Sequence, residues 1–381
     1  AAMAMAALMR AHDFEPVEAD GPEGTTAAAH ITGTTLPVAL ALAERQGVSG
    51  ADFLTALVVG DDIAARLAVS SGFDVYSGQD NTGTVNGVGA AALAARLLGL
   101  GYEQTVDAFG IVVNQLSGTV DAIYDQTATF RLPMAFAARN AIQAADLAAR
   151  GFSGPADPIE GRHGFLATHC AAPTPERITI GLGETFHGDA VLKPWSCCRA
   201  SHPSVDAASR LYEDGVRAQD IESVVVHVTP RTASGFVGAP FRAGRSPEAS
   251  AAFSIPYTTA CALVNGTVRP HHMTEEAFVD PAVTALLERL EIAPTLDPGE
   301  RLTAEVEVRL ASGEVRRQRV DAPRGDLRTH PLTEEGVREK FRQNVAYGGA
   351  LPPERAEKVI DAVGRIDELE TLAPLIDLMT P

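Results

Sequence analysis

Two short segments near the start of the chain combine a carboxylate with an imidazole. His12-Asp13-Phe14-Glu15 follows an Ala-rich stretch, and His30 lies beyond a loop that contains Gly21-Pro22-Glu23-Gly24. A carboxylate and an imidazole that meet on loops between helices can act as an acid/base pair. The alternative is that His12 and Asp13 end a helix and His30 lies on a surface loop, and spacing alone favours this alternative.

The densest group of reactive side chains lies in residues 192–206. This segment holds one of only three lysines, the only tryptophan, two adjacent cysteines, an arginine and a histidine. Lys193, Arg199 and His202 could together bind two carboxylates of a substrate. The segment falls at a predicted domain junction, where small-molecule clefts form. The alternative is a Trp-anchored linker with solvated charges, and the adjacent cysteines are more typical of buried packing than of nucleophiles.

Three further segments place a polar side chain beside a predicted helix start. In Ser77-Gly-Gln-Asp80-Asn-Thr-Gly-Thr84 the side chains and amides could hold an anion, although an ordinary N-cap gives the same pattern. Arg131 lies among apolar neighbours, which predicts burial with an anionic partner, either a substrate or a structural carboxylate. Tyr257 opens a helix, where its hydroxyl could face a cleft or be capped in the core.

The composition limits the classes of partner. The formal charge of −18 repels nucleic acid and anionic membrane surfaces, so we expect neither as a partner. An anionic substrate therefore requires a local cluster of cations in a pocket. Four cysteines without CxxC or Cys/His spacing indicate no metal site and favour a reducing cytoplasm. We see no signal peptide and no apolar run long enough to predict a membrane span. Since the chain begins within an Ala-rich helical pattern, we expect the true N-terminus to lie upstream.

The pattern of apolar residues predicts a mainly α protein in two parts. Apolar residues recur at three- and four-residue steps over 36–47, 85–98, 103–117 and 134–150, which predicts an all-helical domain. A strand is expected at 221–228, and a hairpin at 302–320 with helices at 203–213 and 249–265. Residues 188–329 then form a smaller α+β lid domain. The helical tail (333–346, 352–363, 365–379) is expected to pack back, so that residues 1–187 and 330–381 form one large helical domain.

Taken together and in this order, these segments resemble the MmgE/PrpD family over essentially the whole chain. The most specific stretches are residues 30–44, residues 193–207 and Phe253-Ser-Ile-Pro-Tyr257. The family includes methylcitrate dehydratases, cis-aconitate decarboxylases and iminodisuccinate epimerases. The resemblance implies a helical domain built from both chain ends, an α+β lid and a homodimer. It also implies chemistry on di- or tricarboxylic acids without a cofactor or a metal.

The resemblance assigns catalytic roles to Asp13, His30, Lys193 and Tyr257. It places Arg199 and His202 around the substrate carboxylates, and we add Asp80 and Arg131 as substrate-binding candidates (four residues in all: Asp80, Arg131, Arg199, His202). Three positions depart from the family pattern. Glu15-Pro16-Val17 replaces Asp-Asp-Thr, Asp80-Asn81 replaces His-Pro, and Phe130-Arg131-Leu-Pro133 stands where a lysine precedes Leu-His. Arginine keeps the charge of that lysine but does not release its proton at working pH.

The sequence thus predicts a cofactor-independent lyase of the dehydratase or decarboxylase type that acts on a small carboxylic acid. His30, oriented by Asp13, would exchange the α-proton, while Lys193, Arg131 and Arg199 would stabilise the developing negative charge. Tyr257 would donate to the leaving group or to a carboxylate. Two alternatives stay open at this stage: an epimerase that uses the same proton chemistry, and a non-catalytic relative that only binds a ligand.

Overall fold

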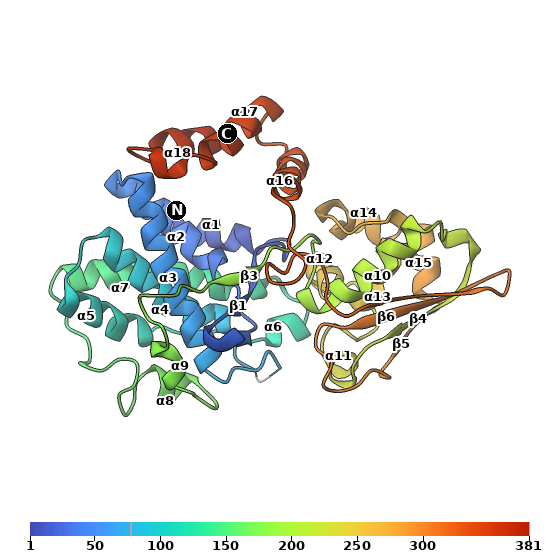
Figure 1. Cartoon of the computed structure of the whole chain (residues 1–381), viewed down its shortest axis with the longest axis horizontal. Coiled ribbons are helices and arrows are strands. Elements are labelled where there is room, and N and C mark those ends of the chain that lie inside the picture. The colour runs from blue at the N-terminus through green and yellow to red at the C-terminus, as the bar shows by residue number, and fades with distance from the viewer. Residues whose placement is uncertain (77, 381) are drawn as a thin grey trace.

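A computed structural model describes residues 1–76 and 78–380 and shows two lobes (Figure 1). We call the first the helical lobe, and it contains most of the chain before residue 180. Its helices are α1 (Ala2–Met9), α2 (Thr32–Gln46), α3 (Gly50–Ser70), α4 (Val85–Leu97), α5 (Tyr102–Val113), α6 (Asp121–Tyr124), α7 (Leu132–Ala149), α8 (Phe165–His169) and α9 (Glu176–Thr179). The predicted helices at 36–47, 85–98, 103–117 and 134–150 correspond to α2, α4, α5 and α7.

Small residues let the central helices α3 and α4 approach closely. A Cβ atom on Gly60 would lie 2.9 Å from the carbonyl oxygen of Gly89, and one on Gly89 would lie 2.4 Å from the carbonyl oxygen of Gly60. Both helices are rich in alanine, and most of α4 is completely buried. This close crossing fixes α4, whose first turn faces the loop that carries His30.

A three-stranded antiparallel sheet corrects the prediction of an all-helical domain. Its order is β2-β1-β3, with β1 at Val17–Asp20, β2 at Thr26–Ala27 and β3 at Asp189–Val191. The sequence did not predict this sheet because strands of two to four residues carry too little periodicity. The pairing of β1 with β3 brings the start of the chain beside the segment that contains Lys193.

Arg66 organises the segment that leads from α9 to β3. Its side chain is 1% exposed and its Nε donates to the carboxylate of Asp62. Its Nη atoms donate to the carbonyl oxygens of Ile178, Ile180, Gly181 and Thr185. One buried arginine therefore satisfies four carbonyl groups of a segment that has little secondary structure of its own.

The second lobe, which we call the sheet lobe, is built on the sheet β5-β4-β6-β7. Its strands are β4 (Ile221–His227), β5 (Leu290–Ala293), β6 (Ala304–Leu310) and β7 (Val315–Val320), and its helices are α10 (His202–Glu213), α11 (Pro230–Ser234), α12 (Pro247–Ala252), α13 (Ile255–Asn265), α14 (Glu275–Phe278) and α15 (Pro281–Leu287). The predicted strand at 221–228 and the hairpin at 302–320 are confirmed. Helices α10, α13 and α15 cover the sheet, and their apolar residues form a core with β4 and β6.

The single helix predicted over 249–265 is two helices. α12 ends at Ala252 and α13 starts at Ile255. Pro256 has no amide hydrogen with which to continue the first helix, and the Ser254 hydroxyl accepts a hydrogen bond from the amide of Tyr257. Ser254 is therefore the N-cap of a new helix.

The tail helices are α16 (Glu334–Gly348), α17 (Pro353–Val363) and α18 (Ala373–Met379). Val359, Leu372 and Leu375 belong to the core of the helical lobe, and the amide of Gly50 donates to the carbonyl oxygen of Leu369. α16 lies between the lobes (Figure 1). The exact domain boundaries at residues 187 and 329 stay a prediction. Within the described residues, no helix combines the length and the apolar character that a membrane crossing requires.

Candidate active site

A buried ion pair joins Asp13 to Lys193, 180 residues further along the chain. Lys193 Nζ donates to Asp13 Oδ2 at 2.8 Å and to the carbonyl oxygen of Asp13 at 2.7 Å. The two side chains are 1% and 0% exposed. Asp13 has a φ of +47°, a left-handed conformation that is uncommon outside glycine but tolerated by aspartate. Lys193 thus holds both the backbone and the carboxylate of a residue with an uncommon backbone conformation.

A second buried carboxylate, Glu15, binds His30. Glu15 Oε1 accepts a hydrogen bond from Arg10 Nη1 at 3.0 Å and lies 2.9 Å from His30 Nδ1. Burial alone would raise the pKa of Glu15, but His30, Lys193 and Arg10 together hold that pKa well below its ordinary value. Glu15 therefore stays ionised and forms an ion-pair contact with Nδ1, although the geometry of this contact is not that of a hydrogen bond, and Nε2 is left for chemistry. The sequence assigned an orienting role to Asp13, but the structure places Glu15 against the ring.

The loop that carries His30 is held by side chains from other elements. Asn86, on the first turn of α4, donates to the carbonyl oxygen of His30 at 2.7 Å. The carboxylate of Asp189 accepts from the amides of Ile31 and Thr32, so β3 supplies the N-terminal cap of α2. The imidazole of His30 is 16% exposed, whereas Asp13 and Lys193 are covered. Solvent or a substrate therefore reaches His30 more readily than the paired groups behind it.

A second carboxylate behind this cap predicts a pH dependence of stability. Thr35 Oγ1 donates to Asp61 Oδ1 at 2.6 Å, and burial, with the nearby charge of Asp189, raises the pKa of Asp61 to about 7. Between the unfolded pKa of about 4 and about 7 the folded chain binds more protons than the unfolded chain. The contribution of Asp61 to stability is therefore present below pH 4 and is lost as the pH rises through about 7.

We expect the free-energy advantage of the native chain over Asp61→Asn to shrink as the pH rises from 5 to 8. Denaturant unfolding of both proteins at the two pH values measures this difference. Glu44→Gln, an exposed substitution on α2, should show no such change. An equal difference between native chain and Asp61→Asn at both pH values would contradict the assignment.

Arg131 and Asp80, both predicted to bind substrate, lie beside this centre but already have protein partners. Arg131 Nη2 donates to Glu248 Oε2 at 2.6 Å, across the junction of the two lobes, and its guanidinium lies 5.3 Å from the centroid of the Phe130 ring. Asp80 Oδ1 accepts from the amide and hydroxyl of Thr82. Against the effect of burial, the charge of Glu15 and then that of Asp80 raise the pKa of Arg10. Asp80 is an N-cap, while Ser77, which opens that segment, lies outside the described residues.

Arg199 contacts both lobes, whereas His202 is buried within its own segment. Arg199 donates to the carbonyl oxygen of Arg324 at 3.1 Å and lies 3.8 Å from Glu18 and 3.9 Å from Asp326. His202 is fully buried, with Nε2 3.2 Å from the carbonyl oxygen of Cys197 and Nδ1 3.4 Å from Arg199. Burial, with Arg199 and Lys193 nearby, holds the pKa of His202 well below its usual value, so the ring is neutral. Their predicted contact with substrate carboxylates stays a prediction.

Tyr257 lies in the core of the sheet lobe. Its ring packs against Phe241 and Phe278, and its hydroxyl donates to the carbonyl oxygen of His272 at 2.6 Å. Burial raises the pKa of the phenol. The structure therefore brings together Asp13, His30 and Lys193, but gives the Tyr257 hydroxyl a backbone partner, and its catalytic role stays a prediction.

The adjacent cysteines pack against the site without being activated. Burial raises the pKa of Cys198 to about 12 and raises that of Cys197 well above its usual value. Both therefore stay protonated thiols at neutral pH, which agrees with the packing interpretation. Trp195 behind them donates through Nε1 to Asp206 at 2.8 Å.

Three residues of this centre were not predicted from the sequence: Glu15, Arg10 and Lys340. Glu15 was treated only as a departure from the family pattern, although its two-residue step from Asp13 was visible. Arg10 is the first basic residue after an Ala-rich stretch, and the scarcity of lysine pointed to Lys340 without indicating a location. Lys340 Nζ donates to the carbonyl oxygen of Phe14 at 2.9 Å.

Asp13, Glu15 and His30 offer three donor atoms within 4.8 Å of one another, a spacing that could suit a metal ion. The two carboxylates are already paired with Lys193 and Arg10. A cation would have to displace these groups or lie beside them, and both are unfavourable in a buried site. The arrangement fits an ion-paired acid/base centre better than a metal centre.

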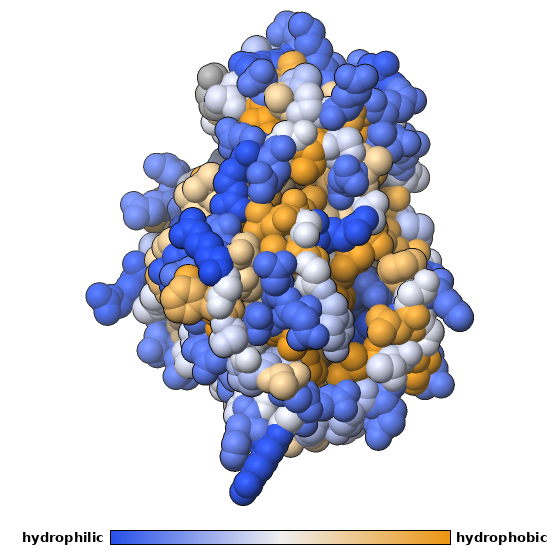
Figure 2. Space-filling model, turned by 90° about the vertical axis from the view of Figure 1, so that its left-hand side faces the viewer, coloured by the Kyte–Doolittle hydropathy of each residue, from blue (hydrophilic) through white to orange (hydrophobic). Residues whose placement is uncertain are grey.

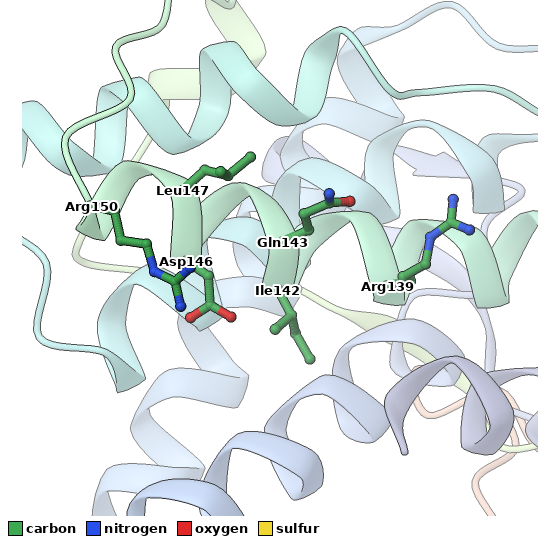
Figure 3. A pocket seen from close by; sticks show the side chains of 6 residues that line it. All are labelled: Arg139, Ile142, Gln143, Asp146, Leu147 and Arg150. Carbon is green, nitrogen blue, oxygen red and sulfur yellow. The ribbon is translucent and has the colours of Figure 1, made fainter.

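The outer face of α7 has a depression of about 330 Å³ that is separate from this centre. Figure 3 shows its six lining side chains on successive turns of this one helix: Arg139, Ile142, Gln143, Asp146, Leu147 and Arg150. Asp146 also pairs with Arg45 of α2 at 2.9 Å. A site lined by one helix lacks the converging polar groups of a catalytic cleft, so we place the chemistry at Asp13, Glu15, His30 and Lys193.

The fold and this centre define a two-lobed protein whose buried acid/base group is assembled from distant parts of the chain. Family models of the MmgE/PrpD N-terminal domain and C-terminal domain match residues 1–178 and 195–366. The chain therefore belongs to the MmgE/PrpD family, as its sequence resemblance indicated.

Curated relatives cover nearly the whole chain. It is 27% identical to the cis-aconitate decarboxylase-like protein oryM of Aspergillus oryzae, over 98% of this chain and 82% of that protein. It is 26% identical to the cis-aconitate decarboxylase of Aspergillus terreus (100% and 80%) and 27% identical to that of Mus musculus (92% and 74%). Family and relatives together indicate an enzyme of the lyase type.

Proposed function

We propose that the protein is a cofactor-independent lyase, of the decarboxylase or dehydratase type, that acts on a small di- or tricarboxylic acid by moving an α-proton. The observation that carries this proposal is the convergence of two paired groups, Asp13 with Lys193 and Glu15 with His30. The first pair provides the positive charge of Lys193, and the second provides the imidazole of His30 with Nδ1 next to Glu15. Relatives named as cis-aconitate decarboxylases support this substrate class, and cis-aconitate is the first acid to test.

In the proposed reaction His30 Nε2 exchanges the proton, and Glu15 stabilises the imidazolium that forms. In a dehydration the α-proton passes to His30, the electron pair of the broken C–H bond forms a C=C bond, and the β-hydroxyl takes up a proton and departs as water. In a decarboxylation a carboxylate departs as CO₂, and the electron pair left on carbon takes a proton. The cations Lys193 and Arg131 would stabilise the negative charge that develops on the remaining carboxylate in either reaction.

Screening the purified protein by mass spectrometry tests the proposal. The acids are cis-aconitate and hydroxy-, unsaturated and amino di- and tricarboxylates. We expect loss of CO₂ or water from at least one of them. Epimerisation without such a loss would favour the isomerase alternative, and binding without any conversion would favour the non-catalytic one.

The pairing of Arg131 with Glu248 predicts how an acidic substrate binds. The carboxylate of Glu248 pairs with Arg131, the cation that we assign to substrate binding. Glu248 and the substrate carboxylate therefore compete for Arg131. We expect Glu248→Gln to lower KM for the acid by a factor of about 1.4 to 5 with little change in kcat, because a partly exposed pair contributes about 0.2–1 kcal/mol. Steady-state kinetics measures both constants. Arg131→Gln should raise KM, and an unchanged KM in both variants would contradict this role.

We also propose that the protein is a homodimer, as the family resemblance implies. Figure 2 shows apolar side chains gathered across the face of the helical lobe that lies opposite the sheet lobe. Such a patch is typical of a surface covered by a partner. Sedimentation equilibrium should give twice the 40.0 kDa chain mass, and a monomer at micromolar concentration would contradict the proposal.

A further inference from the structure

Lys340, on the tail helix α16, contacts the centre described above. Lys340 lies on a helix that otherwise faces solvent for much of its surface, with Arg338 and Glu339 exposed beside it. Its Nζ donates to the carbonyl oxygen of Phe14 at 2.9 Å and lies 3.8 Å from the centroid of the Phe14 ring. A hydrogen bond and a cation–π contact on the same residue fix the ammonium against one peptide of the N-terminal segment.

Phe14 is the residue between the two site carboxylates. Asp13, before it, has the strained φ of +47° and is bound through its own carbonyl oxygen by Lys193. Two ammonium groups, from residues 193 and 340, therefore bind the consecutive carbonyl oxygens of Asp13 and Phe14. The direction of these two peptides decides where the Asp13 and Glu15 side chains point, because each carboxylate leaves the backbone next to a clamped carbonyl.

The charges around Lys340 come from both lobes. Glu15 attracts it, whereas Lys193 and Arg269 repel it. Burial, and then Lys193, lower the pKa of Lys340 to about 7. The charge of Lys340 also contributes to the lowered pKa of His202, which belongs to the sheet lobe. An ammonium kept in such a position is typical of a functional constraint rather than of a surface helix.

We propose that Lys340 is a positioning residue of the site, which clamps the Phe14 peptide so that Asp13 and Glu15 face Lys193 and His30. This inference rests on the function proposed above for the same centre. It makes the tail helix α16 a part of the active site rather than only a part of the scaffold. Lys340 itself acts through Phe14 and needs no contact with the substrate.

Three variants test the clamp. Lys340→Met keeps most of the stem but removes the charge and the donor, Lys340→Arg keeps both, and Lys358→Met removes an exposed lysine of α17 as a matched control. On the acid identified by the screen, we expect Lys340→Met to lower kcat at least tenfold with KM changed less than threefold. Lys340→Arg should recover part of kcat and move the basic limb of the pH profile upward, since arginine stays charged. Lys358→Met should match the native chain.

A second measurement needs no turnover. Hydrogen exchange followed by mass spectrometry on the peptide that spans residues 11–18 should be at least tenfold faster in Lys340→Met than in the native chain and Lys358→Met. Peptides of α4 and β4 should be unchanged, which shows that the fold is intact. If exchange in residues 11–18 does not change, the clamp is wrong, whatever the activity. If the native chain converts no acid while the exchange result holds, the proposed function fails and the positioning role of Lys340 stands.

Discussion

Lys193→Met is expected to lower the free energy of unfolding by about 3–5 kcal/mol and to abolish turnover, because it leaves the buried carboxylate of Asp13 without its cation. Lys193 is completely covered and makes both of its hydrogen bonds to Asp13. Asp13 Oδ1 already has no hydrogen-bond partner among the described residues, so Oδ2 would then be left unpaired as well. Denaturant unfolding measures the loss of stability.

The double variant Lys193→Met with Asp13→Asn separates the ion pair from packing. Removing both charges should restore at least half of the lost stability, since no unpaired buried carboxylate is left. Turnover should stay absent in the double variant because the positive charge is missing. If Lys193→Met unfolds with the same free energy as the native chain, the buried pair has no structural role and the geometry assigned to the centre is wrong.

His30→Gln is expected to lower kcat by a factor of about 10²–10⁴ with little change in stability. Glutamine retains an amide that can reach Glu15, but it cannot accept and release a proton at neutral pH. The imidazole is partly exposed, so its loss should leave no large cavity. Steady-state kinetics and thermal unfolding measure the two effects.

His163→Gln is the matched control, since this histidine is exposed in the same lobe. It should keep the kcat of the native chain. A His30→Gln protein with more than half of the native kcat would show that the proton is moved by another group, and Tyr257 would then be the next residue to test.

The long elements of the fold were predictable because their periodicity is local. The β6–β7 hairpin followed from residue types within a few positions, and the structure confirms it. The sheet β2-β1-β3 was not predictable, because its strands are short and β3 lies about 160 residues after β2. Ser254 and Pro256 indicated a break between α12 and α13, but the apolar pattern around them favoured one continuous helix.

Some residues of the candidate site could also be predicted from the sequence, and others could not. Asp13, His30 and Lys193 carried a signal in residue type and in the family resemblance, and the structure brings them together. The contact of Glu15 with His30 depends on the loop conformation that Asn86 and Asp189 impose on His30. Such positioning by distant residues leaves no local pattern in the sequence.

Solvent deuterium is the most direct probe of the central claim, that the His30–Glu15 pair moves a proton at the carbon next to a carboxylate while Lys193 stabilises the charge. The acid found by the screen is incubated in D₂O with the native chain or His30→Gln, and product and recovered acid are examined by mass spectrometry and NMR. The account predicts deuterium at the reacting carbon with the native chain, and at least a hundredfold slower appearance with His30→Gln, which still binds the acid. Equal rates of deuterium incorporation in the two proteins would contradict it.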